Sequence, residues 1–226
     1  MRTMFLCDLV VIRRQLPQIA LTSLICVLVF GVLTAASAAI VIMVSLMVTY
    51  MIIVTLAAYD DAGGWAAFRL TLPVSRRDVV LGRYATTMVA CLASTALGIA
   101  LSAIIGPIET AVLSSTTGGE VLITMGWNLS DTLMFALVGI SLSLAYMAVV
   151  LPVYLTIGTT KGARLLVVLL FMAPLALLAM GNGIVSSIPE SFTTGMVILV
   201  ALPVVALALF AISATISMRL YARRDL

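Results

Sequence analysis

Charged residues fall in a few short clusters, and long uncharged runs separate these clusters. The runs lie between Arg14 and Asp60, Arg83 and Glu109, Asp131 and Lys161, Arg164 and Glu190, and Glu190 and Arg219. One helical crossing of a bilayer takes about 20 apolar residues, so each run holds one crossing, and the first and longest run holds two. We therefore predict six transmembrane helices, at about residues 17–36, 39–58, 84–106, 131–155, 163–182 and 194–218.

The residues before the first predicted span have a pattern of their own. Four apolar residues recur at helical spacing and share one face: Phe5, Leu9, Ile12 and Leu16. With Arg13 and Arg14 on the rest of the surface, this pattern is typical of a short amphipathic helix in the lipid headgroup region. A basic start and the small residues at 36–38 also resemble a signal peptide. However, the apolar run exceeds the usual length of roughly 7–15 residues and continues into the next span.

Basic residues are distributed asymmetrically about the predicted spans. All 12 lysines and arginines lie within residues 2–14, 69–83, 161–164 and 219–224, which six spans place on one side of the membrane. The connections on the other side, residues 107–130 and 183–193, carry Glu109, Glu120 and Glu190 and no basic residue. Because basic residues concentrate on the cytoplasmic side, both termini are predicted to be cytoplasmic.

The composition indicates an integral membrane protein. Hydrophobic residues make up 63% of the chain and charged residues 9%, with a mean hydropathy of +1.28, whereas a soluble domain has about 25% charged residues. We interpret residues 1–226 as one all-α transmembrane domain. Pro152, Pro174 and Pro203 are candidate hinges within spans, although ordinary membrane helices also contain proline. Small residues such as Gly98 and Gly139 favour close helix packing, within the chain or between two copies.

Residues that usually carry catalysis or bind metals are scarce. The sequence has no histidine, and Cys7, Cys26 and Cys91 are isolated from one another. The single lysine, Lys161, does not complete a nucleotide-binding loop. We therefore expect no enzyme activity, no bound cofactor or metal, and no nucleic-acid partner, with ATP left to another chain. All charges are expected in loops or at span ends, which argues against an ion-coupled carrier.

The polar segment after the second predicted span is the most informative part of the chain. Asp60 and Asp61 begin it, and three apolar residues at i, i+3 and i+7 then share one face of a short helix: Trp65, Phe68 and Leu72. Pro73 ends that helix, because the residue before a proline is disfavoured in the helical region. The pattern fits a helix lying on the inner leaflet and a helix docked in a partner's groove equally well.

Three motifs resemble those of small permeases of the ABC type-2 exporter family. The first motif joins Tyr59-Asp60-Asp61 and Trp65 to the run LTLPVSRRDVVLGRY at 70–84. The second joins PVYLTIG at 152–158 to KGAR at 161–164. The third is the tail SMRLYARRDL at 217–226. The chain departs from the family pattern in two places. Residues 155–157 replace a basic-aromatic pair, and Asp60 stands where glutamate is frequent. The resemblance covers nearly the whole chain.

The resemblance implies a permease that pairs with a second copy or a homologue, each docked on a separate cytoplasmic ABC ATPase that binds ATP and Mg²⁺. It implies an ATPase-coupling segment that contains Asp60, Asp61, Trp65, Phe68, Arg69, Leu72, Pro73, Arg76 and Arg77. The amphipathic helix at Arg2–Leu16, with Phe5, Leu9, Ile12, Arg13 and Arg14, would be the interfacial connecting helix beside it.

The expected function is ATP-driven export of a hydrophobic or amphipathic substrate, such as a peptide, an antimicrobial or a drug, across a bacterial cell membrane. A membrane immunity or scaffold protein without transport activity is an alternative, and an ion-coupled carrier is another. The sequence leaves the substrate, the partner ATPase, the substrate path and the choice between homodimer and heterodimer open.

Overall fold

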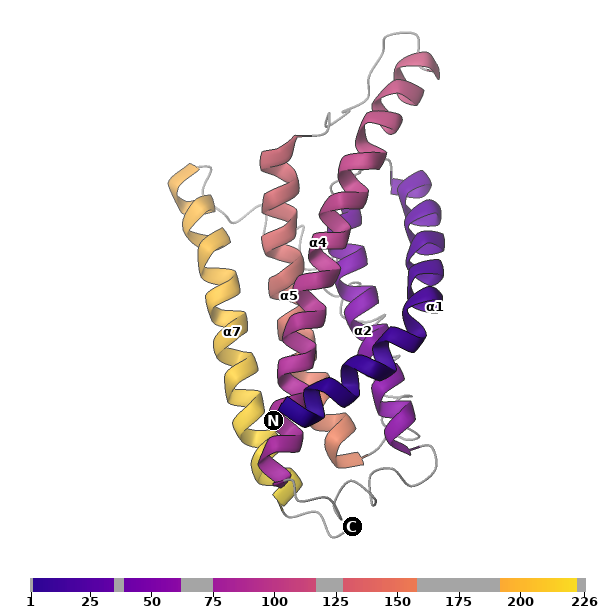
Figure 1. Cartoon of the computed structure of the whole chain (residues 1–226). Coiled ribbons are helices and arrows are strands. Elements are labelled where there is room, and N and C mark those ends of the chain that lie inside the picture. The colour runs from indigo at the N-terminus through magenta and orange to yellow at the C-terminus, as the bar shows by residue number, and fades with distance from the viewer. Residues whose placement is uncertain (1, 35–38, 62–74, 117–127, 158–191, 223–226) are drawn as a thin grey trace.

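The computed structural model describes residues 2–34, 39–61, 75–116, 128–157 and 192–222. These residues form five helices and no strand: α1 (Arg2–Thr34), α2 (Ala39–Asp61), α4 (Arg76–Thr116), α5 (Leu129–Ile157) and α7 (Phe192–Ala222). Figure 1 shows α2, α4, α5 and α7 running along one another as a bundle, while α1 bends across one side of it. The predicted all-α fold class is confirmed for the described part of the chain.

Four of these helices contain stretches that are long and apolar enough to cross a membrane. The stretches are Ile40–Asp60, Arg77–Ile108, Leu129–Leu155 and Leu199–Tyr221. Large apolar side chains point outward along them; Ile104 and Val204, for example, are 61% and 62% exposed. Such an outer surface suits lipid contact. The count of six spans and the cytoplasmic termini stay predictions, and the predicted span at 163–182 lies outside the described residues.

Helix α1 differs from its prediction. We expected a short helix over residues 1–16 and a separate span from residue 17, but one helix runs from Arg2 to Thr34 with Pro17 inside it. Figure 1 shows a sharp bend in α1: its first part crosses α4 and α2, and its second part runs along the bundle. A proline removes a helical hydrogen bond and crowds the preceding turn, which gives such a bend a physical cause.

Helix α4 is longer than its predicted span at both ends. It begins at Arg76, because the Ser75 hydroxyl accepts a hydrogen bond from the Asp78 amide (3.1 Å) and donates one to the Asp78 carboxylate (2.8 Å). This reciprocal pair caps the helix start. The helix then continues through Pro107 to Thr116. The predicted external loop from residue 107 is therefore wrong over residues 107–116.

The centre of the bundle is a seam of small and hydroxylated residues on α2, α4 and α5. The Ser45 hydroxyl lies 2.9 Å from the Thr95 hydroxyl of α4 and 2.9 Å from the Ser143 hydroxyl of α5. Gly98 of α4 packs so closely on α2 that a Cβ there would lie 3.1 Å from the Val41 Cα. Small residues thus allow close packing within the chain.

Helix α7 is joined to the bundle by a second group of hydroxyls. The Tyr84 hydroxyl of α4 lies 2.7 Å from the Ser213 hydroxyl and 2.8 Å from the Ser217 hydroxyl, both of α7. Ser213 also donates to the Ala148 carbonyl of α5 at 2.5 Å. The ring of Tyr84 packs on that of Phe210, with centroids 4.9 Å apart. These contacts connect α4, α5 and α7.

Candidate functional site: a charged cluster at the base of the bundle

Three charged residues from three helices meet near the end of α2 and the beginning of α4. Arg83 of α4 forms ion pairs with Asp8 of α1 and with Asp60 of α2. The Arg83 Nη1–Asp8 Oδ1 distance is 3.2 Å, and Arg83 Nη2 donates a hydrogen bond to Asp60 Oδ2. We call Asp8, Asp60 and Arg83 the charged cluster. One guanidinium fork thus joins two carboxylates that lie far apart in the sequence.

The charged cluster is largely shielded from solvent. The side chain of Arg83 is 5% exposed, that of Asp8 12% and that of Asp60 20%. The Thr86 hydroxyl, one turn beyond Arg83 on α4, donates to Asp8 Oδ2 at 3.1 Å. Charges removed from water need close partners, and removing one partner leaves the others unpaired at a high energetic cost. The cluster therefore holds α1, α2 and α4 in a defined arrangement.

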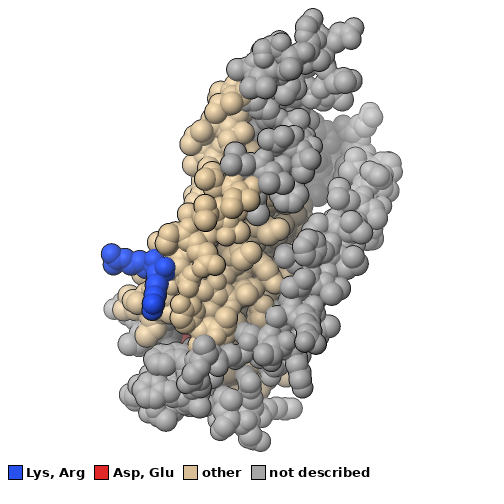
Figure 2. All heavy atoms as spheres, turned by 90° about the vertical axis from the view of Figure 1, so that its right-hand side faces the viewer, with Lys and Arg blue, Asp and Glu red and all other residues tan. Residues whose placement is uncertain are grey.

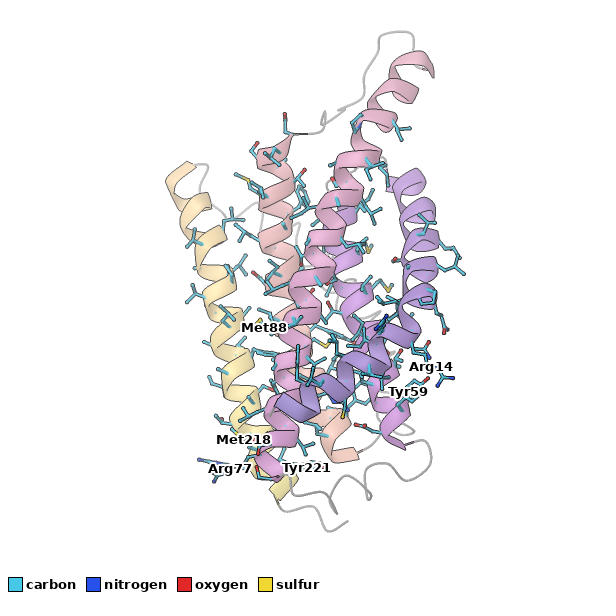
Figure 3. All side chains as sticks on the ribbon, viewed as in Figure 1. Arg14, Tyr59, Arg77, Met88, Met218 and Tyr221 are labelled. Carbon is cyan, nitrogen blue, oxygen red and sulfur yellow. The ribbon has the colours of Figure 1, made fainter. Side chains whose placement is uncertain are left out.

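A second contact reinforces the position of α1. The Gln15 side chain donates a hydrogen bond to the Tyr59 hydroxyl at 2.9 Å, which again links α1 to the last turns of α2. Tyr59 immediately precedes Asp60 in the sequence. Figure 3 shows Tyr59 near the bend of α1. The first part of α1 is thus held against the end of α2 by both a neutral and a charged interaction.

The structure places the predicted coupling residues in different elements. Asp60 belongs to α2, which ends at Asp61, so neither aspartate begins a separate helix. Arg76 and Arg77 form the first turn of α4, and Arg77 is exposed (Figure 3). Five predicted residues lie outside the described residues: Trp65, Phe68, Arg69, Leu72 and Pro73.

The predicted interfacial residues all lie on α1. Phe5, Leu9 and Ile12 line a cavity against α2 and α4, while Arg13 and Arg14 are exposed. These three apolar residues share one face of α1, and that face is turned toward α2 and α4. Their role in an interfacial connecting helix stays a prediction. The candidate hinges Pro152 and Pro203 lie inside α5 and α7. The third, Pro174, lies outside the described residues.

Sequence reasoning did not assign a role to Asp8 or Arg83. We expected every charge in a loop or at a span end, and Arg83 does lie near the start of the apolar stretch Arg77–Ile108 of α4, but it is buried there. One signal was available, because Arg83 follows the apolar run Val79–Leu81 and precedes a long uncharged run. That pattern marks a charge that needs a partner, but it does not identify the partner.

The four long apolar helices and the buried charged cluster at one end of the bundle define a polytopic helical membrane protein. A model of the ABC-2 family transporter proteins matches residues 3–222. The chain belongs to this family, and the predicted resemblance is confirmed. No curated protein and no solved structure matches the chain.

Family membership identifies the chain as a permease subunit of an ABC transporter and as a multi-pass membrane protein. Permeases of this kind associate with an ABC ATPase and are normally non-catalytic. The first and third sequence motifs also meet in space, because Tyr84 ends the first and Ser217 begins the third.

Proposed function

We propose that this chain is the permease subunit of an ATP-driven exporter of a hydrophobic or amphipathic substrate, such as a peptide, an antimicrobial or a drug. In this proposal two permease copies or homologues form a dimer in a bacterial cell membrane, with their termini in the cytoplasm. A separate ABC ATPase docks on residues 62–74 of each copy. ATP and Mg²⁺ bind to the ATPase and not to this chain.

The observation that carries the proposal is the position of the charged cluster. Residues 62–74 directly follow Asp61, the last residue of α2, and directly precede Ser75, which caps α4. Arg83 binds one carboxylate from α2 and one from α1. A force applied to residues 62–74 would therefore act on α2 and α4 directly and reach α1 through Arg83.

This linkage suits a switch between two arrangements of the bundle. Nucleotide binding can drive transport only if the ATPase has a different free energy of interaction with the two arrangements. Ion pairs between helices transmit a displacement because separating the buried charges is unfavourable. In our proposal, closure of the ATPase dimer displaces residues 62–74, and α1, α2 and α4 respond together.

The walls of the described spans support an apolar substrate. Within the four apolar stretches, charged residues occur only near their ends: Asp60, Arg77, Asp78, Arg83, Asp131 and Arg219. Tyr50 and Tyr146 add polar groups farther along the bundle, with ring centroids 6.1 Å apart. Helices without charge along their middle favour hydrophobic or amphipathic molecules over small ions.

The test is to purify the permease with its ATPase, reconstitute both in liposomes, and measure ATP hydrolysis and uptake of a labelled amphipathic peptide into inverted vesicles. We expect Asp60→Asn to keep the ATPase bound and hydrolysing while peptide transport falls roughly tenfold, within the range of typical coupling energies. Arg219→Gln, an exposed residue of α7, is the control and should leave both unchanged. Equal transport by Asp60→Asn and Arg219→Gln would refute coupling through the cluster.

The docking segment requires a separate measurement. The double variant Trp65→Ala, Phe68→Ala removes two residues of the apolar face predicted for the helix at Asp60–Leu72. We expect it to insert in the membrane but to lose co-purification with the ATPase. Retained association together with unchanged transport would exclude this segment as the docking site. Solute movement by the permease alone, driven by an ion gradient, would exclude the exporter proposal as a whole.

A further inference from the structure

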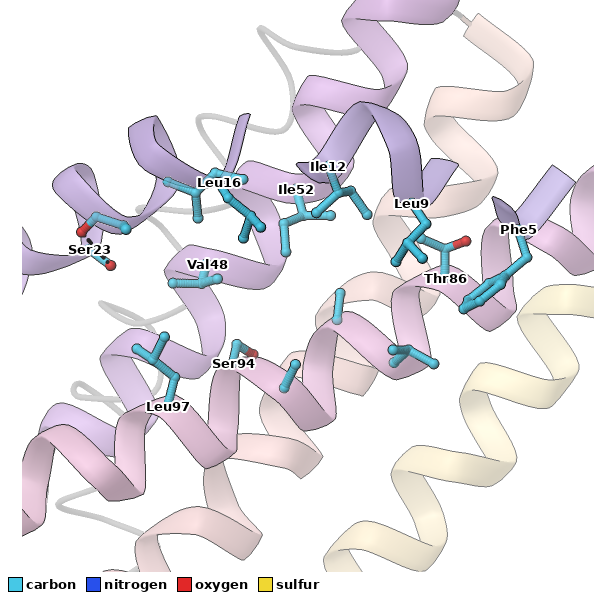
Figure 4. Close-up of a pocket in the computed structure, with 15 residues that line it drawn as sticks. Phe5, Leu9, Ile12, Leu16, Ser23, Val48, Ile52, Thr86, Ser94 and Leu97 are labelled. Carbon is cyan, nitrogen blue, oxygen red and sulfur yellow. Dashed lines mark hydrogen bonds between the residues drawn. The ribbon is translucent and has the colours of Figure 1, made fainter. Parts of the chain in front are cut away.

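A cavity of about 200 Å³ lies between α1, α2 and α4 (Figure 4). The bent helix α1 contributes its apolar stripe as one wall, including Leu9 and Ile12, and Val48 of α2 and Ala93 of α4 lie in the other walls. Figure 4 shows Leu9, Ile12 and Leu16 pointing from α1 toward α2 and α4. The cavity exists because the bend in α1 leaves space between the helix and the bundle.

The lining offers hydrocarbon and no free hydroxyl. Its three polar residues are Ser23, Thr86 and Ser94. Ser23 donates to the Ala20 carbonyl at 2.9 Å, Thr86 to Asp8 at 3.1 Å, and Ser94 to the Cys91 carbonyl at 2.9 Å. Because each hydroxyl proton is already donated within the protein, the lining has no free hydroxyl donor for an acceptor group of a ligand. The mostly hydrocarbon lining therefore favours an apolar part of a ligand.

The mouth of the cavity continues into the outer surface of the helices. Leu9 is 45% exposed, Leu16 51% and Val89 47%, although all three line the cavity. In a membrane protein, apolar side chains exposed on this flank face lipid acyl chains. An acyl chain can therefore enter from the bilayer without crossing a polar barrier.

Positive charge lies beside the mouth. Arg13 follows Leu9 by four residues and precedes Leu16 by three, so it is adjacent to the apolar stripe on the helix surface. Arg13 and Arg14 are both exposed. Figure 2 shows positive side chains projecting from one edge of this side of the molecule. Exposed arginines at the membrane surface attract anionic headgroups.

We propose that this cavity binds a phospholipid with an anionic headgroup, with one acyl chain between α1 and α4 and the phosphate at Arg13 and Arg14. The lipid would fill the space between α1 and the bundle. It would thereby stabilise the position of α1, whose Asp8 belongs to the charged cluster. The proposal rests on the membrane location of the chain and is independent of the direction or energy source of transport.

The test is native mass spectrometry of the full chain in detergent, titrated separately with dioleoyl phosphatidylglycerol and dioleoyl phosphatidylcholine. We expect one phosphatidylglycerol to bind roughly tenfold more tightly than phosphatidylcholine. Arg13→Gln with Arg14→Gln should remove this preference. Equal affinity for both lipids in the unmodified chain would overturn the assignment of an anionic headgroup.

Two phenylalanine substitutions test the position of the acyl chain. Ala93→Phe places a ring in the cavity, and Ala96→Phe places the same ring at an exposed position of α4 outside it. We expect Ala93→Phe to lose the bound phosphatidylglycerol and Ala96→Phe to retain it. Ala20→Phe, from the α1 wall, should act like Ala93→Phe and guards against a local folding defect.

Equal lipid retention by Ala93→Phe and Ala96→Phe would show that the lipid is bound elsewhere and would overturn the proposal. A loss of dimer in the Ala93→Phe spectrum, with lipid binding unchanged, would identify the cavity as a contact between copies and would also overturn it. Either result leaves the proposed export activity untouched, because the transport assay with Asp60→Asn is a separate experiment.

Discussion

The charged cluster and the hydroxyl seam both connect α2 to α4, but they do so in different ways. In the cluster, one long arginine joins carboxylates on α1 and α2. In the seam, the Ser45 hydroxyl of α2 lies 2.9 Å from a hydroxyl of α4 and 2.9 Å from one of α5, and glycines bring the backbones together. The first connection is electrostatic and lies near the segment that we propose to contact the ATPase. The second is steric and lies deeper in the bundle.

The charged cluster and the hydroxyl seam differ in whether their polar groups keep another partner when one partner is removed. Hydroxyls of the seam also bond within their own helix: Ser94 and Thr95 of α4 both donate to the Cys91 carbonyl, at 2.9 and 2.8 Å. A buried guanidinium or carboxylate has no comparable substitute, since its charge still needs compensation. We infer that the cluster is the more sensitive of the two, and the following predictions compare them from the largest expected effect to the smallest.

Replacing Arg83 should have the largest effect. Arg83→Met removes the positive charge between Asp8 and Asp60 and should destabilise the fold by about 3–5 kcal/mol, as is typical when one partner of a buried ion pair is removed. Arg83→Lys keeps the charge but cannot bind two carboxylates with one planar group. Its stability should therefore lie between that of Arg83→Met and that of the unmodified chain. Unfolding in detergent, followed by circular dichroism, measures these differences.

The matched control for this prediction is Arg77→Met, an exposed position near the start of α4. It should change stability by less than about 0.5 kcal/mol, as surface substitutions usually do. Similar losses for Arg77→Met and Arg83→Met would show that the burial of Arg83 contributes little. The inference that the charged cluster is more sensitive than the hydroxyl seam would then be wrong.

Enlarging Gly98 should have the next largest effect. A Cβ at this position would lie 3.1 Å from the Val41 Cα and 3.2 Å from the Val41 carbonyl oxygen. Both atoms belong to the backbone and cannot move aside alone, so Gly98→Leu must separate α2 from α4. We expect a loss of about 1–3 kcal/mol in the same unfolding assay. Ala100→Leu, an exposed position on the same helix, is the control and should be nearly neutral.

Removing one hydroxyl from the seam should have a modest effect. Ser45→Ala deletes the oxygen between Thr95 and Ser143, but Thr95 keeps its bond to the Cys91 carbonyl. Hydrogen bonds between membrane helices contribute about 0.6 kcal/mol on average, so we expect a loss of about 1 kcal/mol. Thr215→Ala, whose exposed hydroxyl donates to the Ile212 carbonyl of its own helix, is the control. A loss equal to that of Arg83→Met would contradict the proposed ranking.

The sequence predicted the four apolar helices α2, α4, α5 and α7 of the described residues, because charge and apolar run length are local properties. The predicted spans 131–155 and 194–218 lie within α5 (Leu129–Ile157) and α7 (Phe192–Ala222). The extension of α4 was missed for two reasons. Charged residues at its start are compatible with a helix once Ser75 caps it, and Pro107 inside it does not end it.

The candidate site was predicted only in part. The apolar face of α1 followed from helical periodicity, but periodicity does not say whether that face contacts lipid or α2 and α4. The charged cluster joins residues 8, 60 and 83, and no local pattern connects positions so far apart in the sequence. The two halves of the Asp8–Arg83 pair could be recognised as charges near apolar runs, whereas their contact depends on the bend in α1.

The smallest predicted effect concerns the contact between α4 and α7. Tyr84→Phe removes the hydroxyl that lies near Ser213 and Ser217, while the ring keeps its packing on Phe210 and Ser213 keeps its bond to the Ala148 carbonyl. We expect a loss of about 0.6 kcal/mol in the free energy of unfolding.

Combining Tyr84→Phe with Ser217→Ala in a double-mutant cycle isolates the interaction between these two residues. Thr215→Ala, whose exposed hydroxyl donates to the Ile212 carbonyl of its own helix, is again the control and should be nearly neutral. Coupling near zero would mean that the two sequence motifs meet here without stabilising the fold, and coupling as large as that between Arg83 and Asp60 would remove the distinction between neutral and charged connections.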